Sequence, residues 1–254
     1  MAIARISHTI DSEKGVALSV DRYTGAGRDT AIVICPGFFQ SKDTKTFQGL
    51  SRALAADWDV IAMDFRGHGR SSGLFTFSAK ETTDLEAVLR WTKEKYRNIA
   101  VMGFSLGGAA AINTLAKQPQ TAKTVIAVSA PALFEDIEFK FWTPEAMRTG
   151  LQGLEAGSGC RPGNLWLKKE RPVERVAHLA PIPVLFIHGT RDVIVGVEHS
   201  RRLHAAAAAP KRIEMIEGGS HAEALFRDEP ERFSQLVGAW FAQTLPPILR
   251  GCGS

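Results

Sequence analysis

The sequence predicts an α/β protein with a mostly parallel sheet, helices on both faces of that sheet, and a short cap insertion. Short apolar runs rich in β-branched residues recur along the chain, and most are followed by a segment with helical spacing of apolar residues. Strands that alternate with helices in this way favour parallel pairing. The 254 residues, 44% hydrophobic and 23% charged, suit one domain with a substantial core.

The first part of the chain predicts a hairpin followed by alternating strands and helices. Residues 2–23 alternate apolar and polar side chains around a turn at residues 11–15, as expected for an antiparallel edge of the sheet. The continuous β-rich run Thr30–Cys35 predicts a strand that is covered on both faces. The next expected elements are a helix at Thr44–Ala56, a buried strand at Asp59–Asp64 and an amphipathic helix at Ala79–Lys95.

The remaining elements continue the same alternation. The apolar run that begins at Asn98 predicts a strand, and the Ala-rich segment after it predicts a helix that ends near Gln118. Further strands are expected at Lys123–Ser129, Pro183–His188 and Arg212–Glu217, with helices at Glu198–Ala209 and Glu231–Thr244. Because ligands bind at the carboxyl ends of the strands in such sheets, we expect the functional site at that edge.

One long stretch breaks the alternation and divides the chain into parts. Residues 131–180 are rich in aromatic side chains and hold a Gly-rich loop. Long excursions in a compact domain are usually lids or disordered loops, and the aromatic content argues against disorder. We therefore expect a core at residues 1–130 and 181–246, a cap at residues 131–180 and a tail at residues 247–254. The alternative is that these aromatic side chains only pack the insertion onto the sheet.

Charge and cysteine content exclude several classes of protein. The net charge of +4 comes from scattered basic residues without an aromatic-interleaved basic stripe, which argues against nucleic-acid binding. Three cysteines are too few for a disulfide framework. No apolar run approaches the roughly 20 residues of a membrane span, and the N-terminal segment lacks a signal-peptide pattern. We expect a soluble cytoplasmic protein, and the oligomeric state stays open.

A short motif in the middle of the chain predicts a nucleophile. Gly103-Phe-Ser105-Leu-Gly107 lies between a predicted strand and a predicted helix. This G-x-S-x-G pattern in that setting is typical of a strained turn that exposes a serine at the edge of a sheet. A Cβ at Gly103 or Gly107 would collide with the backbone that such a sharp turn brings close. Unpaired N–H groups at the helix start would stabilise negative charge beside Ser105.

A serine hydroxyl needs a base, and the base needs an acid that orients it. Asp192 follows the predicted strand at Pro183–His188, and His221 follows the last predicted strand. The chain order serine, acid, histidine matches the order known for such elbows. Alternatively, Asp192 is a turn residue and His221 a loop histidine. His188 is expected inside a strand end near the site, and His68 is expected to hydrogen-bond its own loop and the neighbours of that loop.

The oxyanion formed during acyl transfer needs two backbone N–H donors. Leu106, the residue after the nucleophile, is one candidate, and Phe38, in the loop after the strand that ends at Cys35, is the other. No cluster of residues has metal-ligand spacing, and we expect neither a metal nor a cofactor. The side chains expected to line a substrate pocket are Phe39, Phe134, Trp142 and Val193.

Taken together, these motifs resemble the α/β-hydrolase family, in particular its small esterase, lipase and serine-aminopeptidase-like branches. The resemblance covers nearly the whole chain. It implies a serine hydrolase that acts through an acyl-enzyme, with Ser105, Asp192 and His221 as the triad. The segments that carry it are Pro36-Gly37-Phe38, Asp64-Phe-Arg-Gly-His68-Gly-Arg-Ser71, the Ser105 elbow, His188-Gly-Thr-Arg-Asp192 and Gly218-Gly-Ser-His221.

Two positions depart from the family pattern. Pro36-Gly37 stands where the family often has His-Gly. That histidine is not catalytic in the family, so the change bears on the assignment of the first oxyanion donor and leaves the chemistry intact. Leu106 stands where the family's proline-releasing peptidases tend to have Trp, which disfavours a peptidase.

The sequence therefore predicts hydrolysis of small to medium acyl or aryl carboxylic esters, with a small-molecule ester as the partner. The same machinery also serves a thioesterase, a lactonase, an amidase or aminopeptidase, and a cofactor-free perhydrolase. An alternative from another class is a catalytically idle homologue that only binds a ligand, since the fold alone never determines the function.

Overall fold

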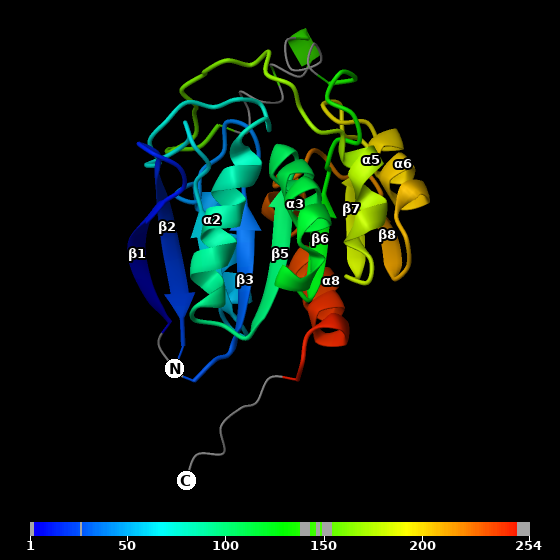
Figure 1. The fold of residues 1–254 in the computed structure, drawn as a ribbon. Coiled ribbons are helices and arrows are strands. Elements are labelled where there is room, and N and C mark those ends of the chain that lie inside the picture. The colour runs from blue at the N-terminus through cyan, green and yellow to red at the C-terminus, as the bar shows by residue number, and fades with distance from the viewer. Residues whose placement is uncertain (1–2, 26, 138–142, 146–147, 149–153, 248–254) are drawn as a thin grey trace.

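An eight-stranded sheet forms the centre of the protein in the computed structural model, which describes residues 3–25, 27–137, 143–145, 148 and 154–247. The strands lie in the order β1-β2-β4-β3-β5-β6-β7-β8 (Figure 1). The pairs β1–β2 and β2–β4 are antiparallel, and every other pair is parallel. The predicted fold class is confirmed.

Most strands match the apolar runs of the sequence. Strands β3 to β7 consist wholly of buried residues, because helices cover both faces of this part of the sheet. The expected hairpin is β1–β2, which forms one edge. The strand bounds are β1 Ala4–Asp11, β2 Ala17–Thr24, β3 Thr30–Cys35, β4 Asp59–Met63, β5 Asn98–Phe104, β6 Thr124–Val128, β7 Val184–Gly189 and β8 Lys211–Ile216.

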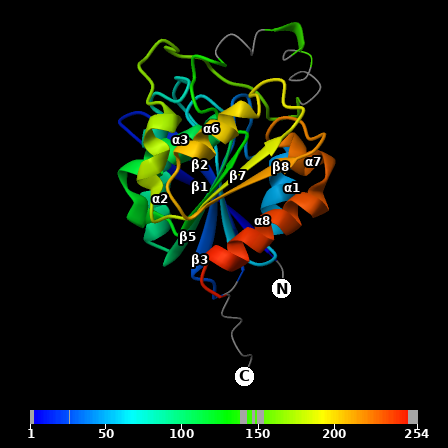
Figure 2. The ribbon, with the colours of Figure 1, turned by 90° about the vertical axis from the view of Figure 1, so that its right-hand side faces the viewer.

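Helices lie on both sides of the sheet, as Figure 2 shows in a view turned by 90°. One face carries α1 (Lys45–Leu54), α7 (Ala224–Asp228) and α8 (Pro230–Thr244). The opposite face carries α2 (Glu81–Lys93), α3 (Leu106–Lys117), α5 (Pro172–Arg175), the 3₁₀ turn η3 (Val176–Leu179) and α6 (Glu198–Ala206). A further 3₁₀ turn, η1 (Pro119–Thr121), joins α3 to β6.

Local chemistry determines where the helices begin and end. Thr44 caps α1, since its side chain accepts the Phe47 N–H. The helix therefore begins at Lys45, one residue later than expected. Helix α2 begins at Glu81, two residues later than expected, because Phe77 and Ser78 take the left-handed conformation just before it. Helix α6 stops at Ala206, three residues earlier than expected. Ala207 is extended, and Pro210 cannot continue a helix.

The parallel strands end at one edge of the sheet, where the described part of the insertion also lies (Figure 1). The Gly159 N–H donates to the Phe39 carbonyl at 2.8 Å, and the Arg161 N–H donates to the Gly67 carbonyl at 2.7 Å. These bonds fasten the insertion to the loops after β3 and β4. Further along, α5 and η3 pack against α3. Among the described residues, no helix has the length and apolar character needed to cross a bilayer.

Phe233 connects α8 to the sheet, and its removal should lower the stability of the fold. Its buried ring lies 6.3 Å from the ring of Phe104 in β5 and 6.1 Å from that of Phe226 in α7. We expect Phe233→Ala to lower the free energy of unfolding by about 3–5 kcal/mol, because it leaves a cavity. Chemical denaturation measures this change. Gln235→Ala, on the exposed side of the same helix, should change it by less than about 0.5 kcal/mol, and equal effects would contradict the assignment.

Candidate active site

Ser105 stands at the turn between β5 and α3, in a strained backbone conformation. Its φ and ψ angles are 50° and −120°, and only 1% of the residue is exposed. A Cβ at Gly103 would overlap the Gly107 carbonyl oxygen, and one at Gly107 would overlap the carbonyl oxygens of Cys35 and Pro36. The steric role expected for both glycines is thus present in the structure.

Asp192 and His221 meet at the ends of neighbouring parallel strands. The His221 Nδ1 atom lies 2.7 Å from Asp192 Oδ2. Asp192 follows β7 and His221 follows β8, and the two loops approach closely at Gly189, where a Cβ would overlap the carbonyl oxygens of Gly219 and Ser220. The strand ends therefore bring together two of the three expected residues.

The carboxylate of Asp192 is held in its charged form. Its Oδ1 atom accepts the N–H groups of Ile194 at 3.0 Å and Val195 at 2.9 Å, and its Oδ2 atom lies 3.3 Å from His188 Nε2. Burial alone would raise the pKa of Asp192, but the charge of His221 and the hydrogen bonds from both histidines hold it well below its usual range. The acid is therefore ionised at neutral pH.

The contact with Asp192 determines how His221 titrates. Burial alone would lower the pKa of the imidazole, but the charge and hydrogen bond of Asp192, with a smaller effect of Glu223, raise it above its ordinary value. Because the ionised carboxylate accepts at Nδ1, the hydrogen of neutral His221 lies on that atom. The Nε2 atom is then free to accept a proton, as a general base requires.

Ser105 and the loop that carries His221 are both bonded to the end of β6. The Ser105 N–H donates to the Val128 carbonyl at 2.8 Å, and the hydroxyl of the next residue, Ser129, accepts the Ala222 N–H at 3.1 Å. Ser105 and the residue after His221 are thus anchored to consecutive residues at the end of β6. Within the described part of the chain, the Ser105 hydroxyl makes no hydrogen bond.

The loop after β3, which contains the expected oxyanion donor Phe38, packs directly on Ser105. A Cβ at Gly37 would stand only 3.1 Å from Ser105 Cβ. Leu106 is the first residue of α3, so its N–H has no partner within the helix. Phe38 follows Gly37 in the loop. Leu106 thus directly follows Ser105, Phe38 directly follows the glycine that packs on it, and their role as oxyanion donors stays a prediction.

Phe39 holds the shape of this loop in a left-handed conformation, with φ of 64°. The Phe39 N–H donates to His68 Nε2 at 3.3 Å, and its carbonyl accepts the Gly159 N–H. His68 Nδ1 lies 3.1 Å from the Arg66 carbonyl, and burial lowers the pKa of His68 to about 4, so the ring is neutral and Nε2 is an acceptor. As expected, His68 bonds its own loop and a neighbouring one.

An apolar cluster adjoins the elbow and contains one of the four expected pocket residues. Phe134 belongs to it, at 1% exposure. Phe39 and Val193 are 40% and 38% exposed and do not belong to it, and Trp142 lies outside the described residues. The sequence reasoning missed most of the cluster, for which the aromatic pair in Phe75-Thr-Phe77 was the available signal. Its buried members are Phe75, Phe77, Leu106, Ala109, Phe134, Ile137, Ile194 and Val195.

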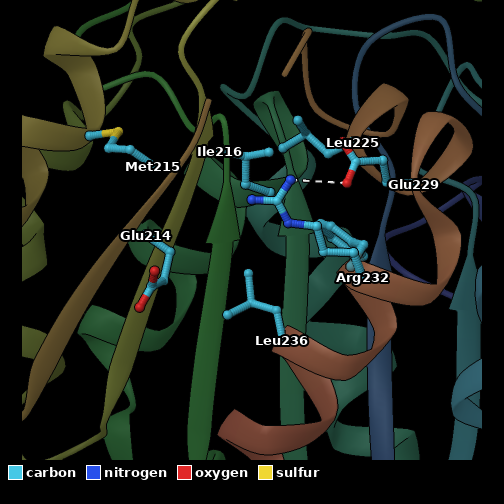
Figure 3. Close-up of a pocket in the computed structure, with 8 residues that line it drawn as sticks. Glu214, Met215, Ile216, Leu225, Glu229, Arg232 and Leu236 are labelled. Carbon is cyan, nitrogen blue, oxygen red and sulfur yellow. Dashed lines mark hydrogen bonds and ion pairs between the residues drawn. The ribbon is translucent and has the colours of Figure 1, made fainter. Parts of the chain in front are cut away.

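A separate cavity of about 130 Å³ lies between β8 and helices α7 and α8 (Figure 3). Arg232, at the start of α8, lines it and forms an ion pair at 3.0 Å with Glu229 of the same helix start. The residues that line it include Met215 and Leu236, and none of the expected site residues is among them. The cavity is therefore distinct from the candidate active site.

Comparison with known proteins identifies the family of the chain. A sequence model described as the alpha/beta hydrolase family matches residues 32–236. The human protein named serine hydrolase BPHL is 25% identical over 238 residues, which span 84% of this chain and 80% of that protein. The uncharacterized protein Rv2715 of Mycobacterium tuberculosis is 26% identical over 275 residues, which span 87% of this chain and 78% of that protein.

Solved structures show the same fold. An esterase of Pyrococcus furiosus superposes with a TM-score of 0.76 at 22% identity, covering 96% of this chain and 92% of its own. The enzyme Est1E of Butyrivibrio proteoclasticus, solved with ferulic acid bound, superposes with a TM-score of 0.74 at 21% identity, covering 94% of this chain and 99% of its own.

The raised pKa of His221 can be tested without an activity assay. We expect an NMR titration of histidine-labelled protein to give His221 a pKa above the ordinary value of about 6.5, because Asp192 stabilises the imidazolium. In Asp192→Asn the burial remains without the charge, so the pKa should fall below that value. Glu223→Gln should lower it less. An unchanged pKa in Asp192→Asn would contradict the ion pair.

Proposed function

The chain belongs to the alpha/beta hydrolase family, and we propose that it is a serine hydrolase that cleaves carboxylic esters through an acyl-enzyme. The observation that carries this proposal is the Asp192–His221 hydrogen bond of 2.7 Å at the edge where the strained elbow presents Ser105. A buried carboxylate, an imidazole with an available Nε2 atom and a serine at a helix start are the parts that acyl transfer needs.

In the proposed mechanism, each group has one task. Ser105 Oγ attacks the ester carbonyl carbon while His221 Nε2 takes its proton, and Asp192 stabilises the imidazolium that forms. The N–H groups of Phe38 and Leu106 stabilise the oxyanion. His221 then gives its proton to the leaving alcohol, and a water molecule activated by His221 releases the acid. The missing Ser105–His221 bond forms when substrate binds, as catalytic hydrogen bonds often tighten in the complex.

The apolar cluster beside the elbow supports small to medium acyl or aryl esters as substrates. The rings of Phe38 and Phe75 stack at 5.0 Å, and the ring of Phe134 lies 6.1 Å from that of Phe77. These aromatic side chains form an apolar wall beside Leu106, the residue that directly follows Ser105. Such a wall favours an apolar group, because burial of apolar surface drives binding.

A homologue that binds a ligand without turning it over is the second candidate. The observation that favours it is the Ser105 hydroxyl, which makes no hydrogen bond within the described residues and is almost fully buried. A fluorophosphonate probe distinguishes the two candidates, because it labels only a serine that a base activates. Covalent labelling at Ser105 supports the hydrolase, and its absence supports the binding protein.

Removal of the nucleophile is the direct test of the proposed function. We expect Ser105→Ala to lower kcat for p-nitrophenyl acetate by about 10⁴-fold or more, since the attacking oxygen is gone. The turnover is measured from released p-nitrophenol. Ser51→Ala, which removes another buried hydroxyl that makes no hydrogen bond to the described residues, serves as the control and should retain activity. Unchanged turnover in Ser105→Ala would reject the proposal.

The pH dependence of kcat/KM should report His221. Protonated His221 cannot accept the Ser105 proton, so activity falls as the pH drops below the pKa of the imidazole. Because Asp192 raises that pKa, we expect the midpoint of the acid limb above about 6.5. Asp192→Asn should lower kcat by about 10⁴-fold and move the remaining limb to lower pH. An acid limb centred near pH 4 would contradict this assignment.

A further inference from the structure

Ser129, the residue directly after β6, contacts the loop that carries His221. Its hydroxyl accepts the Ala222 N–H at 3.1 Å, and both residues are fully buried. Ala222 directly follows His221, so this bond holds the backbone next to the imidazole. The histidine is thus held on two sides: by Asp192 at its ring, and by Ser129 at the following peptide.

Both partners of this bond have unusual backbone conformations. Ser129 has φ of 47° and Ala222 has φ of 48°, in the left-handed region that residues with a Cβ rarely adopt. Such conformations persist where the surrounding structure holds them in place, and they cluster at functional sites. Two strained residues that face each other across one hydrogen bond therefore point to a role at the site.

The position of Ser129 is determined by the sheet. The Ser129 N–H donates to the Ile187 carbonyl of β7 at 2.8 Å, and the Val128 carbonyl accepts the Ser105 N–H at 2.8 Å. The end of β6 is thus bonded both to β7, which leads to Asp192, and to Ser105. A hydroxyl at this point therefore fixes the position of the His221 loop relative to both Asp192 and Ser105.

We propose that Ser129 is a positioning residue that holds His221 within reach of Ser105; this inference rests on the proposed function. Without the hydroxyl, the buried Ala222 N–H has no acceptor, and leaving it unsatisfied is costly. The loop then shifts until that N–H finds another partner, and His221 moves with it. The imidazole leaves the line between Asp192 and Ser105, which impairs proton transfer while the apolar wall still binds substrate.

Three variants at this position separate the hydroxyl from the backbone strain. Ser129→Ala removes the acceptor, Ser129→Cys replaces it with a weak one of similar shape, and Ser129→Gly removes it while relieving the strain. The control is Ser78→Ala, because Ser78 is also buried and left-handed, with φ of 74°, and its hydroxyl makes no hydrogen bond within the described residues.

We expect all three Ser129 variants to lower kcat for p-nitrophenyl acetate about tenfold with KM unchanged, and to slow fluorophosphonate labelling of Ser105 by a similar factor. Ser78→Ala should retain the wild-type values. Wild-type kcat in Ser129→Gly would overturn the proposal, because the residue would then matter only through its backbone. Equal losses in Ser129→Ala and Ser78→Ala, in step with their thermal midpoints, would also overturn it.

An NMR titration of His221 keeps this test independent of the proposed function. The charged groups that face the imidazole are Asp192, from the end of β7, and Glu223, on its own loop. We expect Ser129→Ala to move the pKa of His221 down toward its ordinary value, because the ring separates from Asp192. If wild-type protein neither labels nor turns over an ester, the proposed function fails, and this shift still decides the role of Ser129. An unchanged His221 pKa would overturn it.

Discussion

The hydrogen bond between Asp192 and His221 is the interaction on which the candidate site depends. It joins residues 29 apart in the chain, and it forms because parallel pairing of β7 with β8 ends both strands at one edge. The absence of a side chain at Gly189 lets the two loops approach closely enough for the bond. Burial alone would keep the imidazole neutral to lower pH, so the ionised carboxylate makes His221 a stronger base.

Backbone strain is concentrated at the same edge of the sheet. Phe39, Ser105, Ser129 and Ala222 all have positive φ angles, and each contacts another loop of the site or forms part of the elbow. Conformations of this kind cost about 1–3 kcal/mol each, and the buried core must offset that cost. The arrangement exchanges some stability for groups held in fixed positions, which is what stabilisation of a transition state requires.

The sequence predicts the sheet well because its signals are local, and it predicts the edge of the sheet at which Ser105, Asp192 and His221 lie. Apolar runs identify β3 to β7 as buried strands, and parallel pairing places the residues after β5, β7 and β8 at the same edge of the sheet. The Phe75 and Phe77 side chains are harder to predict, because an irregular loop has no periodicity that tells which way a ring points. The role of Ser129 is equally hard to predict, because a serine after a strand indicates no function until its partner Ala222, 93 residues away, is known.

The motif that begins at Asp64 also gains a physical explanation from the structure. The Asp64 carboxylate accepts the backbone N–H groups of Lys42 at 2.8 Å and Arg70 at 3.1 Å, which joins the loop after β3 to the loop after β4. The fully buried ammonium of Lys42 lies 3.5 Å from the same carboxylate and 3.3 Å from that of Asp21 in β2. A buried charge is tolerated only when paired in this way, so the ion pairs hold the loop after β3 in one place.

Two separate sets of contacts thus anchor the two loops that flank the site, which are the loop after β3 and the loop that carries His221. The loop after β3 is attached to β2 and to the end of β4 through buried charges, and the loop that carries His221 is attached to the ends of β6 and β7 through hydrogen bonds. The two loops contact each other where Gln40 Nε2 donates to Glu223 Oε1 at 2.5 Å. Because each loop is fixed to different strands, the pairing of those strands sets the spacing between Phe38 and His221. Irregular loops can therefore hold a defined geometry here, since the sheet beneath them is rigid.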